Sequence, residues 1–170
     1  MLGIVMVLGT AAVFWFSGGG IITSGEPCTE FDGTVEVQWM NEYGECNEEA
    51  WEADAESRFM KAQTSAFAVF ILYQLFNVLN CRSADQSVFK LGIFNNYAIT
   101  ASFALSASFL LFMVQGSLIE LPIIGIKIGD FLDVVPLQTA DWLIVTATAS
   151  SVFFVDEVRK VIQRNQSRNR

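Results

Sequence analysis

The stretch "FAVFILYQLFNVLNCRS", residues 67–83, decides how this chain is organised. It begins as an apolar run suited to a membrane core, and its last third carries the side-chain amides of Gln74, Asn77 and Asn80. An amide placed in hydrocarbon needs a hydrogen-bond partner. The stretch therefore predicts a membrane-spanning helix with one edge turned toward other helices.

Three more runs resemble this one in composition. Residues 2–16, 64–80, 97–114 and 142–155 contain no Asp, Glu, Lys or Arg. A bilayer core requires about 20 mostly apolar residues, and each run reaches that length with its neutral flanks. We therefore expect an all-α membrane protein, a single bundle of four transmembrane helices with a long acidic outer loop between the first two. The expected spans cover residues 2–20, 62–81, 95–115 and 138–157.

The charged residues lie between and after these runs, and they are unevenly distributed. The segment 18–63 holds eleven acidic residues, whereas 159–170 holds five basic residues and no acid. Four spans place both termini on one side of the membrane, and that side then carries seven Lys or Arg against three on the other. The positive-inside rule makes both termini cytoplasmic and the acidic loop extracellular or lumenal. The connecting segments are the outer loops 21–61 and 116–137, the inner loop 82–94 and the inner basic tail 158–170.

The first run leaves a second interpretation open, since residues 1–25 have the length of a secretory signal peptide. No Lys or Arg precedes the apolar run, so the basic n-region of a signal peptide is missing. A chain that opens directly on an apolar span favours a piece of a larger protein.

Cys28 and Cys46 both lie in the expected outer loop. A disulfide between them is expected because the outside of a cell and the secretory lumen are oxidising. Two free cysteines in a loop remain the alternative, since spacing alone does not prove the geometry. Cys81, at the inner end of the second span, is expected to be a reduced thiol.

The amides of the second span share one edge of the helix. At 100° per residue, Tyr73, Gln74, Asn77 and Asn80 fall within about a third of the circumference. Such an edge either holds neighbouring helices together or lines a path for an ion. Gln74 and Asn77 are the candidates for an ion pathway, and Tyr73 and Asn80 are expected to be polar packing residues.

The third span carries small residues at four-residue spacing, namely Ala98, Ser102 and Ser106. This pattern lets a neighbouring helix approach closely, so Ser102 and Ser106 are also expected to be packing residues.

Several kinds of chemistry are missing from the sequence. It contains no His and no G-x-x-x-x-G-K-[ST] phosphate loop. The acidic residues Glu48, Glu49, Glu52 and Glu56 lack the regular order of a calcium loop, which favours a solvated acidic surface. We therefore expect no catalytic residue and no certain metal site within this chain, and no nucleic-acid partner.

Three quoted stretches carry a resemblance to a known family. They are "QTSAF" at 63–67, "QLFNVLNCRSADQSVFKLGIFNN" at 74–96, and "FFVDEVRKVIQRN" at 153–165. Together the chain resembles the C-terminal transmembrane region, the last four helices, of P-type cation-transporting ATPases in the calcium-pump branch. The resemblance covers essentially the whole chain. It implies a support bundle that packs against the ion-translocating helices of an ATP-driven pump.

The resemblance also gives Gln74 a specific meaning. In sarcoplasmic-reticulum-like pumps the matching position supplies a carboxylate to a calcium site, whereas here it is an amide. This implies a similarity to plasma-membrane-type and many prokaryotic pumps, in which that site is weakened or missing and one calcium per cycle is expected. A neutral amide oxygen is a poorer ligand for a divalent cation than a carboxylate.

The working motifs of such a pump, including D-K-T-G-T and T-G-E-S, do not occur in these residues. The chain is thus expected not to be catalytic by itself, and ATP and Mg²⁺ would bind only to other domains of a full-length pump. The implied partners are the lipid bilayer, the remaining helices of the pump, and an accessory subunit or regulator at the outer loop 21–61, near Trp39 and Trp51.

Two rival interpretations come from other classes of protein. One is a stand-alone four-span interaction protein like claudins or tetraspanins, with a disulfide in its large outer loop, although Trp39 lies between the cysteines and no G-L-W occurs. The other is a small transporter or channel subunit, which ionisable residues at mid-depth in the first and third spans would favour, and there are none.

Overall fold

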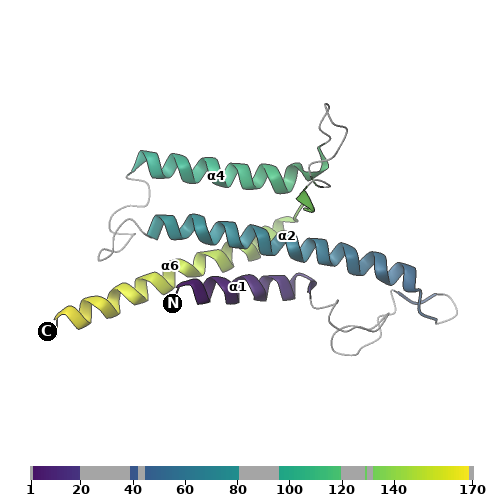
Figure 1. Ribbon diagram of the computed structural model, residues 1–170, viewed down its shortest axis with the longest axis horizontal. Helices are drawn as coiled ribbons and strands as arrows, with labels where there is room; N and C mark the ends of the chain where they lie inside the picture. Colours follow the sequence, from purple (N-terminus) through teal and green to yellow (C-terminus); the bar gives the residue numbers. More distant parts are fainter. Residues whose placement is uncertain are drawn as a thin grey trace.

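The computed structural model of this chain is built from helices (Figure 1). It describes residues 2–19, 39–41, 45–80, 96–119, 129 and 132–168. The helices are α1 (Leu2–Phe16), α2 (Glu48–Asn80), α4 (Tyr97–Gln115), the short 3₁₀ helix η3 (Gly116–Leu118) and α6 (Thr139–Arg168). Within the described ranges the β structure is limited to one isolated bridge between Met40 and Cys46. The expected all-α class is therefore confirmed for this part of the chain.

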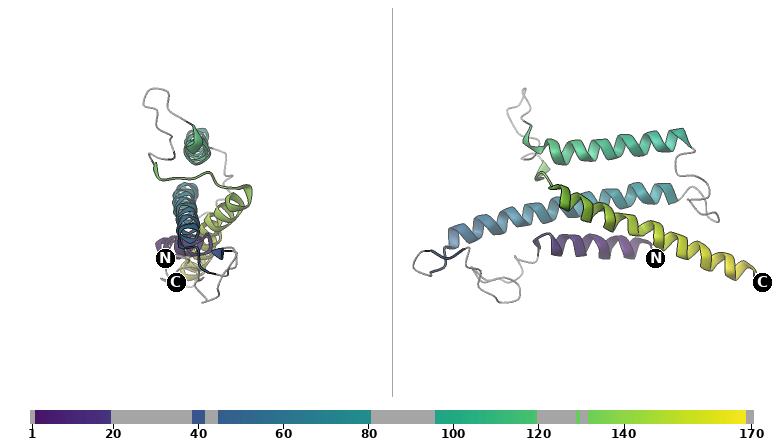
Figure 2. Two further views of the ribbon diagram at one scale, coloured as in Figure 1. Left: turned by 90° about the vertical axis from the view of Figure 1, so that its right-hand side faces the viewer. Right: turned by 180° about the vertical axis from the view of Figure 1, so that it is seen from behind.

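Helix α2 lies at the centre of the arrangement. It contacts each of the other three long helices, while α1 and α6 also contact one another. Figures 1 and 2 show α1 and α6 together on one side of α2, with α4 on the opposite side. The core joins α2 with α1, α6 and the C-terminal end of α4, and its most buried members are Ala68, Val69, Tyr73, Val114, Val145, Ala149 and Val152.

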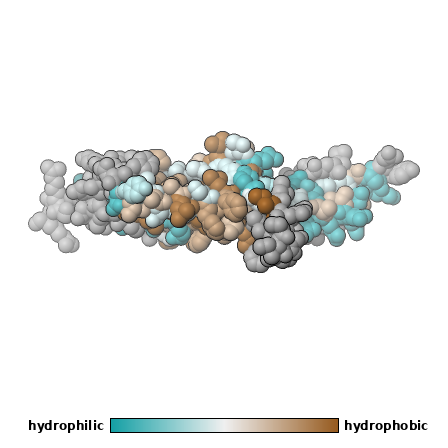
Figure 3. Space-filling model, turned by 90° about the horizontal axis from the view of Figure 1, so that it is seen from above, coloured by the Kyte–Doolittle hydropathy of each residue, from teal (hydrophilic) through white to brown (hydrophobic). Residues whose placement is uncertain are grey.

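Two of the helices, α2 and α4, are long and apolar enough to cross a membrane, and α1 is a shorter apolar helix. In an apolar stretch of 18 residues within α4, only 11% of the residues are buried inside the structure, against 44% in the corresponding stretch of α2. Viewed from the α4 side, apolar residues gather over the middle of the helices, and hydrophilic residues gather over the N-terminal end of α2 (Figure 3). Because Leu105, Phe109 and Phe112 of α4 are exposed, this helix requires apolar surroundings from outside the chain.

Helix α2 begins well before residue 62, where its membrane span was expected to start. Asn47 accepts a hydrogen bond from the backbone N–H of Ala50 at 3.2 Å, and Glu48 and Glu49 lie in the first turn, where negative charge is favourable. The acidic residues from Glu48 onward therefore lie on a helix that continues into the apolar part of α2.

The entry into α6 is fastened to α2 and α4 by polar contacts. Thr64 Oγ1 accepts a hydrogen bond from the backbone N–H of Val135 at 3.1 Å, and Lys61 pairs with Asp141 at 2.9 Å. From α4, Gln115 Nε2 donates to the carbonyl oxygen of Leu137 at 2.8 Å. These contacts fix where α6 starts, and hence its register against α2.

Trp39 forms a second, smaller cluster on the N-terminal half of α2. Its side chain is 2% exposed and packs with Ala55 and Trp51. Its indole Nε1 donates to Asp54 Oδ2 at 3.0 Å, and the guanidinium carbon of Arg58 lies 5.5 Å from the centre of its ring. Trp39 is thus buried within this chain. An accessory partner at the outer loop remains a prediction. Such a partner could not contact the ring of Trp39, because that ring is already covered.

Candidate functional site

The polar residues of α2 and α6 that meet along one line are called here the polar seam. On α2 they are Tyr73 and Asn80, and on α6 they are Ser151, Asp156 and Lys160. Its two ends, near Tyr73 and near Asn80, are built differently.

Tyr73 marks the middle of the bundle. It is 1% exposed, and its hydroxyl oxygen lies 3.2 Å from Ser151 Oγ on α6. On the other side it faces Gly9 of α1, where a Cβ atom would overlap the phenol. A glycine at this position lets α1 approach closely enough to cover the ring, so Tyr73 lies at the junction of three helices.

Asn80 ends α2 and contacts α6 twice. Its side-chain Nδ2 donates to the carbonyl oxygen of Val152 at 3.3 Å. Its own carbonyl oxygen accepts from Lys160 Nζ at 3.4 Å. The last carbonyls of a helix have no partner within the helix, and a cation is favourable at its negative end. Lys160 therefore caps α2 from a neighbouring helix.

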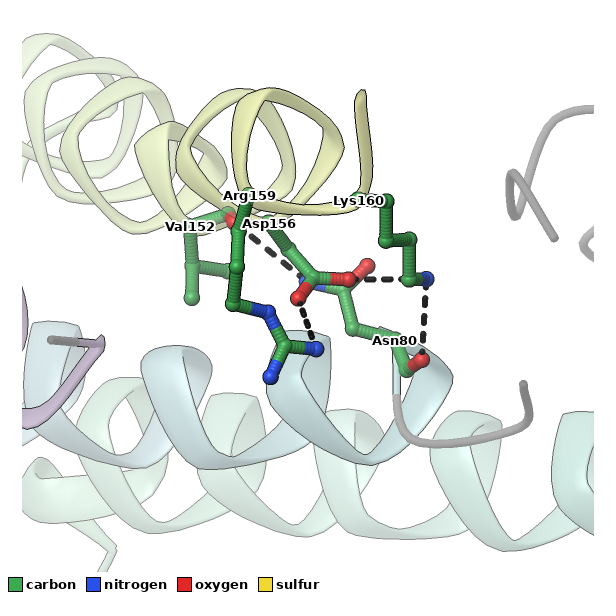
Figure 4. Close-up of polar contacts among 5 residues, drawn as sticks. All are labelled: Asn80, Val152, Asp156, Arg159 and Lys160. Atoms are coloured by element: carbon green, nitrogen blue, oxygen red, sulfur yellow. Dashed lines mark hydrogen bonds and ion pairs between the residues drawn. The ribbon is translucent and has the colours of Figure 1, made fainter. Parts of the chain in front are cut away.

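Asp156 compensates the charge of Lys160 (Figure 4). The two side chains are 1% and 0% exposed, and Lys160 Nζ lies 2.8 Å from Asp156 Oδ2. The other carboxylate oxygen lies 2.7 Å from Nη2 of Arg159, whose side chain is 39% exposed. Each oxygen of Asp156 thus faces a cation, as a buried carboxylate requires. The result is a closed network that joins the end of α2 to α6.

The two ion-pathway candidates are placed apart from this network. Gln74 is exposed, and its Nε2 lies 3.9 Å from the sulfur of Met6 on α1. Asn77 is half-buried, and its Oδ1 is buried without a hydrogen-bond partner among the described residues. Across the described ranges no group of three or more Cys, Asp or Glu side chains could hold a metal ion. The role of either amide in an ion pathway stays a prediction.

Ser102 and Ser106 are exposed on α4. Together with Ala98 they line an apolar groove of about 320 Å³ between α4 and α2, whose other walls include Leu75 and Val78. Next to this groove, the rings of Phe76 on α2 and Phe103 on α4 are stacked, with their centroids 5.9 Å apart. The small-residue face of α4 thus borders a groove in which the two helices do not close on each other.

The structure describes one of the two cysteines of the predicted disulfide. Cys46 is disulfide-bonded, whereas Cys28 lies outside the described residues, so the pairing of the two stays a prediction.

Sequence reasoning missed Asp156, Lys160 and Ser151 as members of the seam. A usable signal was present, because Val152, Asp156 and Lys160 follow one another at four-residue spacing and so share one face of a helix. Lys160 was assigned only to the basic tail.

Comparison with known proteins places this geometry in a family. Residues 1–162 match the family model for the C-terminus of cation transporting ATPases. The chain is 35% identical over 105 residues to calcium-transporting ATPase 1 of Schizosaccharomyces pombe, which covers 61% of this chain and 10% of that protein. It is 32% identical over 112 residues to calcium-transporting ATPase type 2C member 2 of Mus musculus, covering 65% and 11%.

A bacterial relative, the probable cation-transporting ATPase F of Mycobacterium bovis, is 26% identical over 106 residues, covering 62% of this chain and 11% of that protein. The matched region thus amounts to about a tenth of the length of these curated relatives. The expected resemblance is confirmed: the chain is an integral membrane protein that belongs to the family of cation-transporting ATPases, of which it represents the C-terminal region.

Proposed function

We propose that this chain is the C-terminal support part of an ATP-driven pump for Ca²⁺. Its proposed role is to pack against the ion-translocating helices, while ATP and Mg²⁺ bind to other domains of the pump. The transported ion is inferred from the names of the relatives, two of which are calcium-transporting ATPases.

The observation that carries the support role is the way the polar seam is closed. Tyr73 and Asn80 contact Ser151 and Val152 of α6, and Lys160 caps the end of α2. These polar groups satisfy one another and leave little to coordinate an ion. A seam of this kind stiffens the unit of α1, α2 and α6, against which moving helices could work.

We further propose that the chain crosses the membrane four times with both termini in the cytoplasm. Helix α6 has 30 residues. At 1.5 Å per residue it is about 45 Å long, more than the roughly 30 Å of a hydrocarbon core even when it is tilted. Helix α1, with 15 residues, requires its neutral flank to complete a span. The five basic residues of 159–170 favour a cytoplasmic end for α6.

Gln74 is the proposed point of contact with the ion pathway. Unlike Tyr73 and Asn80, it is exposed on the surface of this chain. The remaining helices of a pump could therefore reach it. Since it offers a neutral amide, its contribution to binding a divalent cation would be weaker than that of a carboxylate.

The experiment uses a chimera in which residues 1–162 replace the matched region of a calcium-transporting relative, reconstituted in vesicles. Introducing a carboxylate by Gln74→Glu is expected to change the calcium dependence of ATP-driven uptake, and Gln74→Ala to leave thermal stability unchanged. The matched control is Asn80→Ala, which is expected to lower stability with an unchanged calcium dependence in the folded fraction. Identical calcium dependence in the parent, Gln74→Glu and Gln74→Ala would remove Gln74 from the pathway.

A further inference from the structure

The inner end of α6 carries an exposed apolar stripe on the side away from α2. Phe154 is 72% exposed, Val158 55%, Val161 50% and Ile162 49%. Their spacing of four, three and one residues places them on one face of a helix. The side chains that pack on α2, Val152, Asp156 and Lys160, occupy a different face and are each at most 1% exposed.

The position of this stripe is fixed by the end of α2. Because Lys160 Nζ reaches the carbonyl oxygen of Asn80, the last residue of α2, residues 158–162 lie level with the point where α2 stops. Helix α6 continues to Arg168, and Figure 1 shows its C-terminal end projecting beyond the ends of α2 and α4. The stripe therefore runs from the bundle into the segment that leaves it.

The charge of this segment is strongly positive. Residues 156–170 contain five basic side chains and two acidic ones, Asp156 and Glu157. Asp156 is paired within the seam with Arg159 and Lys160, and Glu157 also has a partner. Arg164, Arg168 and Arg170 follow without a further acid in the sequence.

We infer that the inner end of α6 docks on anionic lipid headgroups, with the stripe of Phe154, Val158, Val161 and Ile162 inserted at the boundary of the hydrocarbon. An apolar face combined with a basic excess is the chemistry that binds a helix to a negatively charged membrane surface. Charge complementarity selects this occupant over another apolar helix, which would cover the stripe but would not require the arginines. Docking would hold the point where α6 leaves the bundle at the headgroups of the inner leaflet.

Hydrogen–deuterium exchange of the 170-residue chain in lipid nanodiscs tests the docking. One set of discs contains phosphatidylcholine alone, and the other contains phosphatidylcholine with phosphatidylserine. The amides of 158–168 are expected to exchange more slowly in the anionic discs, and this protection should be lost at high ionic strength, because salt screens the attraction. Exchange in the centre of α2 serves as the internal reference for folding.

Two pairs of variants separate charge from apolar insertion. Arg164→Gln with Arg168→Gln is expected to reduce the protection by about fivefold for each arginine, whereas Arg164→Lys with Arg168→Lys should retain it. Val158→Gln with Val161→Gln is expected to abolish it, and Val158→Leu with Val161→Leu should preserve it.

Equal exchange of 158–168 in both kinds of disc would overturn the inference, as would protection that ignores salt and the loss of both arginines. Either result would mean that anionic headgroups do not hold this segment of α6. The discs carry the same lipids in both leaflets, and no transport is measured. This test can therefore fail while the proposed function stands, and the proposed function can fail while the docking stands.

Discussion

The buried pair of Asp156 and Lys160 gives the sharpest prediction about stability. Replacing Asp156 by Asn removes the carboxylate that faces Lys160 Nζ at 2.8 Å, while the lysine remains 0% exposed. A buried charge that loses its partner costs about 3–5 kcal/mol of the free energy of unfolding. We therefore expect Asp156→Asn to lower the free energy of unfolding by about that amount.

Lys160→Met should cost less. Asp156 would keep Arg159 Nη2 at 2.7 Å, and that guanidinium is part-exposed and can still compensate the carboxylate. The loss is then mainly the cap on the carbonyl oxygen of Asn80, a hydrogen bond from a charged group worth about 1.5–3 kcal/mol. The double variant Asp156→Leu with Lys160→Met removes both buried charges, and such replacements are often neutral or stabilising. It should therefore be more stable than Asp156→Asn alone.

The assay is reversible denaturant unfolding of the chain in detergent micelles, followed by far-ultraviolet circular dichroism, for the parent, both single variants and the double variant. The reasoning is refuted if Asp156→Asn costs less than about 1 kcal/mol, or if the double variant loses as much as the sum of the two single losses.

Two further variants test packing and capping. Gly9→Ala places a methyl group against the phenol of Tyr73, and we expect it to lower the free energy of unfolding by about 1–3 kcal/mol in the same assay. The control Gly3→Ala should lose no stability, because its Cβ would meet nothing within 4 Å. Equal stability of the two variants would contradict the three-helix junction. Asn96 caps α4 by accepting hydrogen bonds from the N–H groups of Ala98 at 3.1 Å and Ile99 at 3.4 Å. Asn96→Ala should therefore lower the free energy of unfolding by about 0.5–2 kcal/mol and speed amide exchange in the first turn of α4. Asn96→Ser should retain most of the protection of these amides.

The sequence predicts the helices well where the signal is the absence of charge. Helix α4 (Tyr97–Gln115) almost coincides with the expected span 95–115, because a run without ionisable residues and a following glycine define it. Helix α2 is longer than its expected span, since helix formation between Glu48 and Lys61 depends on propensity and capping, which the apolar run does not report. At the far end of α6, by contrast, the basic amphipathic pattern that follows the apolar run predicts the continuation of the helix, which extends to Arg168.

The site was harder to predict, because a helical wheel shows which way each side chain points from its helix but not which other helix it meets. The wheel puts Gln74 and Asn80 on one edge, yet Gln74 lies near Met6 of α1, whereas Asn80 contacts α6. Which helix lies against which part of an edge is decided by packing angles and by close approaches such as Gly9 to Tyr73. Similarly, the burial of Trp39 depends on Asp54 and Arg58, which only the fold brings beneath it.

The most direct test of the central claim is ATP-driven ⁴⁵Ca²⁺ uptake by the chimera itself, in which residues 1–162 replace the matched C-terminal region of the Schizosaccharomyces pombe calcium-transporting ATPase. If this chain is the support part of such a pump, the chimera should take up Ca²⁺ in vesicles when ATP is present, and uptake should fall when Asp156→Asn breaks the seam. A chimera that inserts and folds like its parent, yet shows no ATP-dependent uptake, would contradict the account.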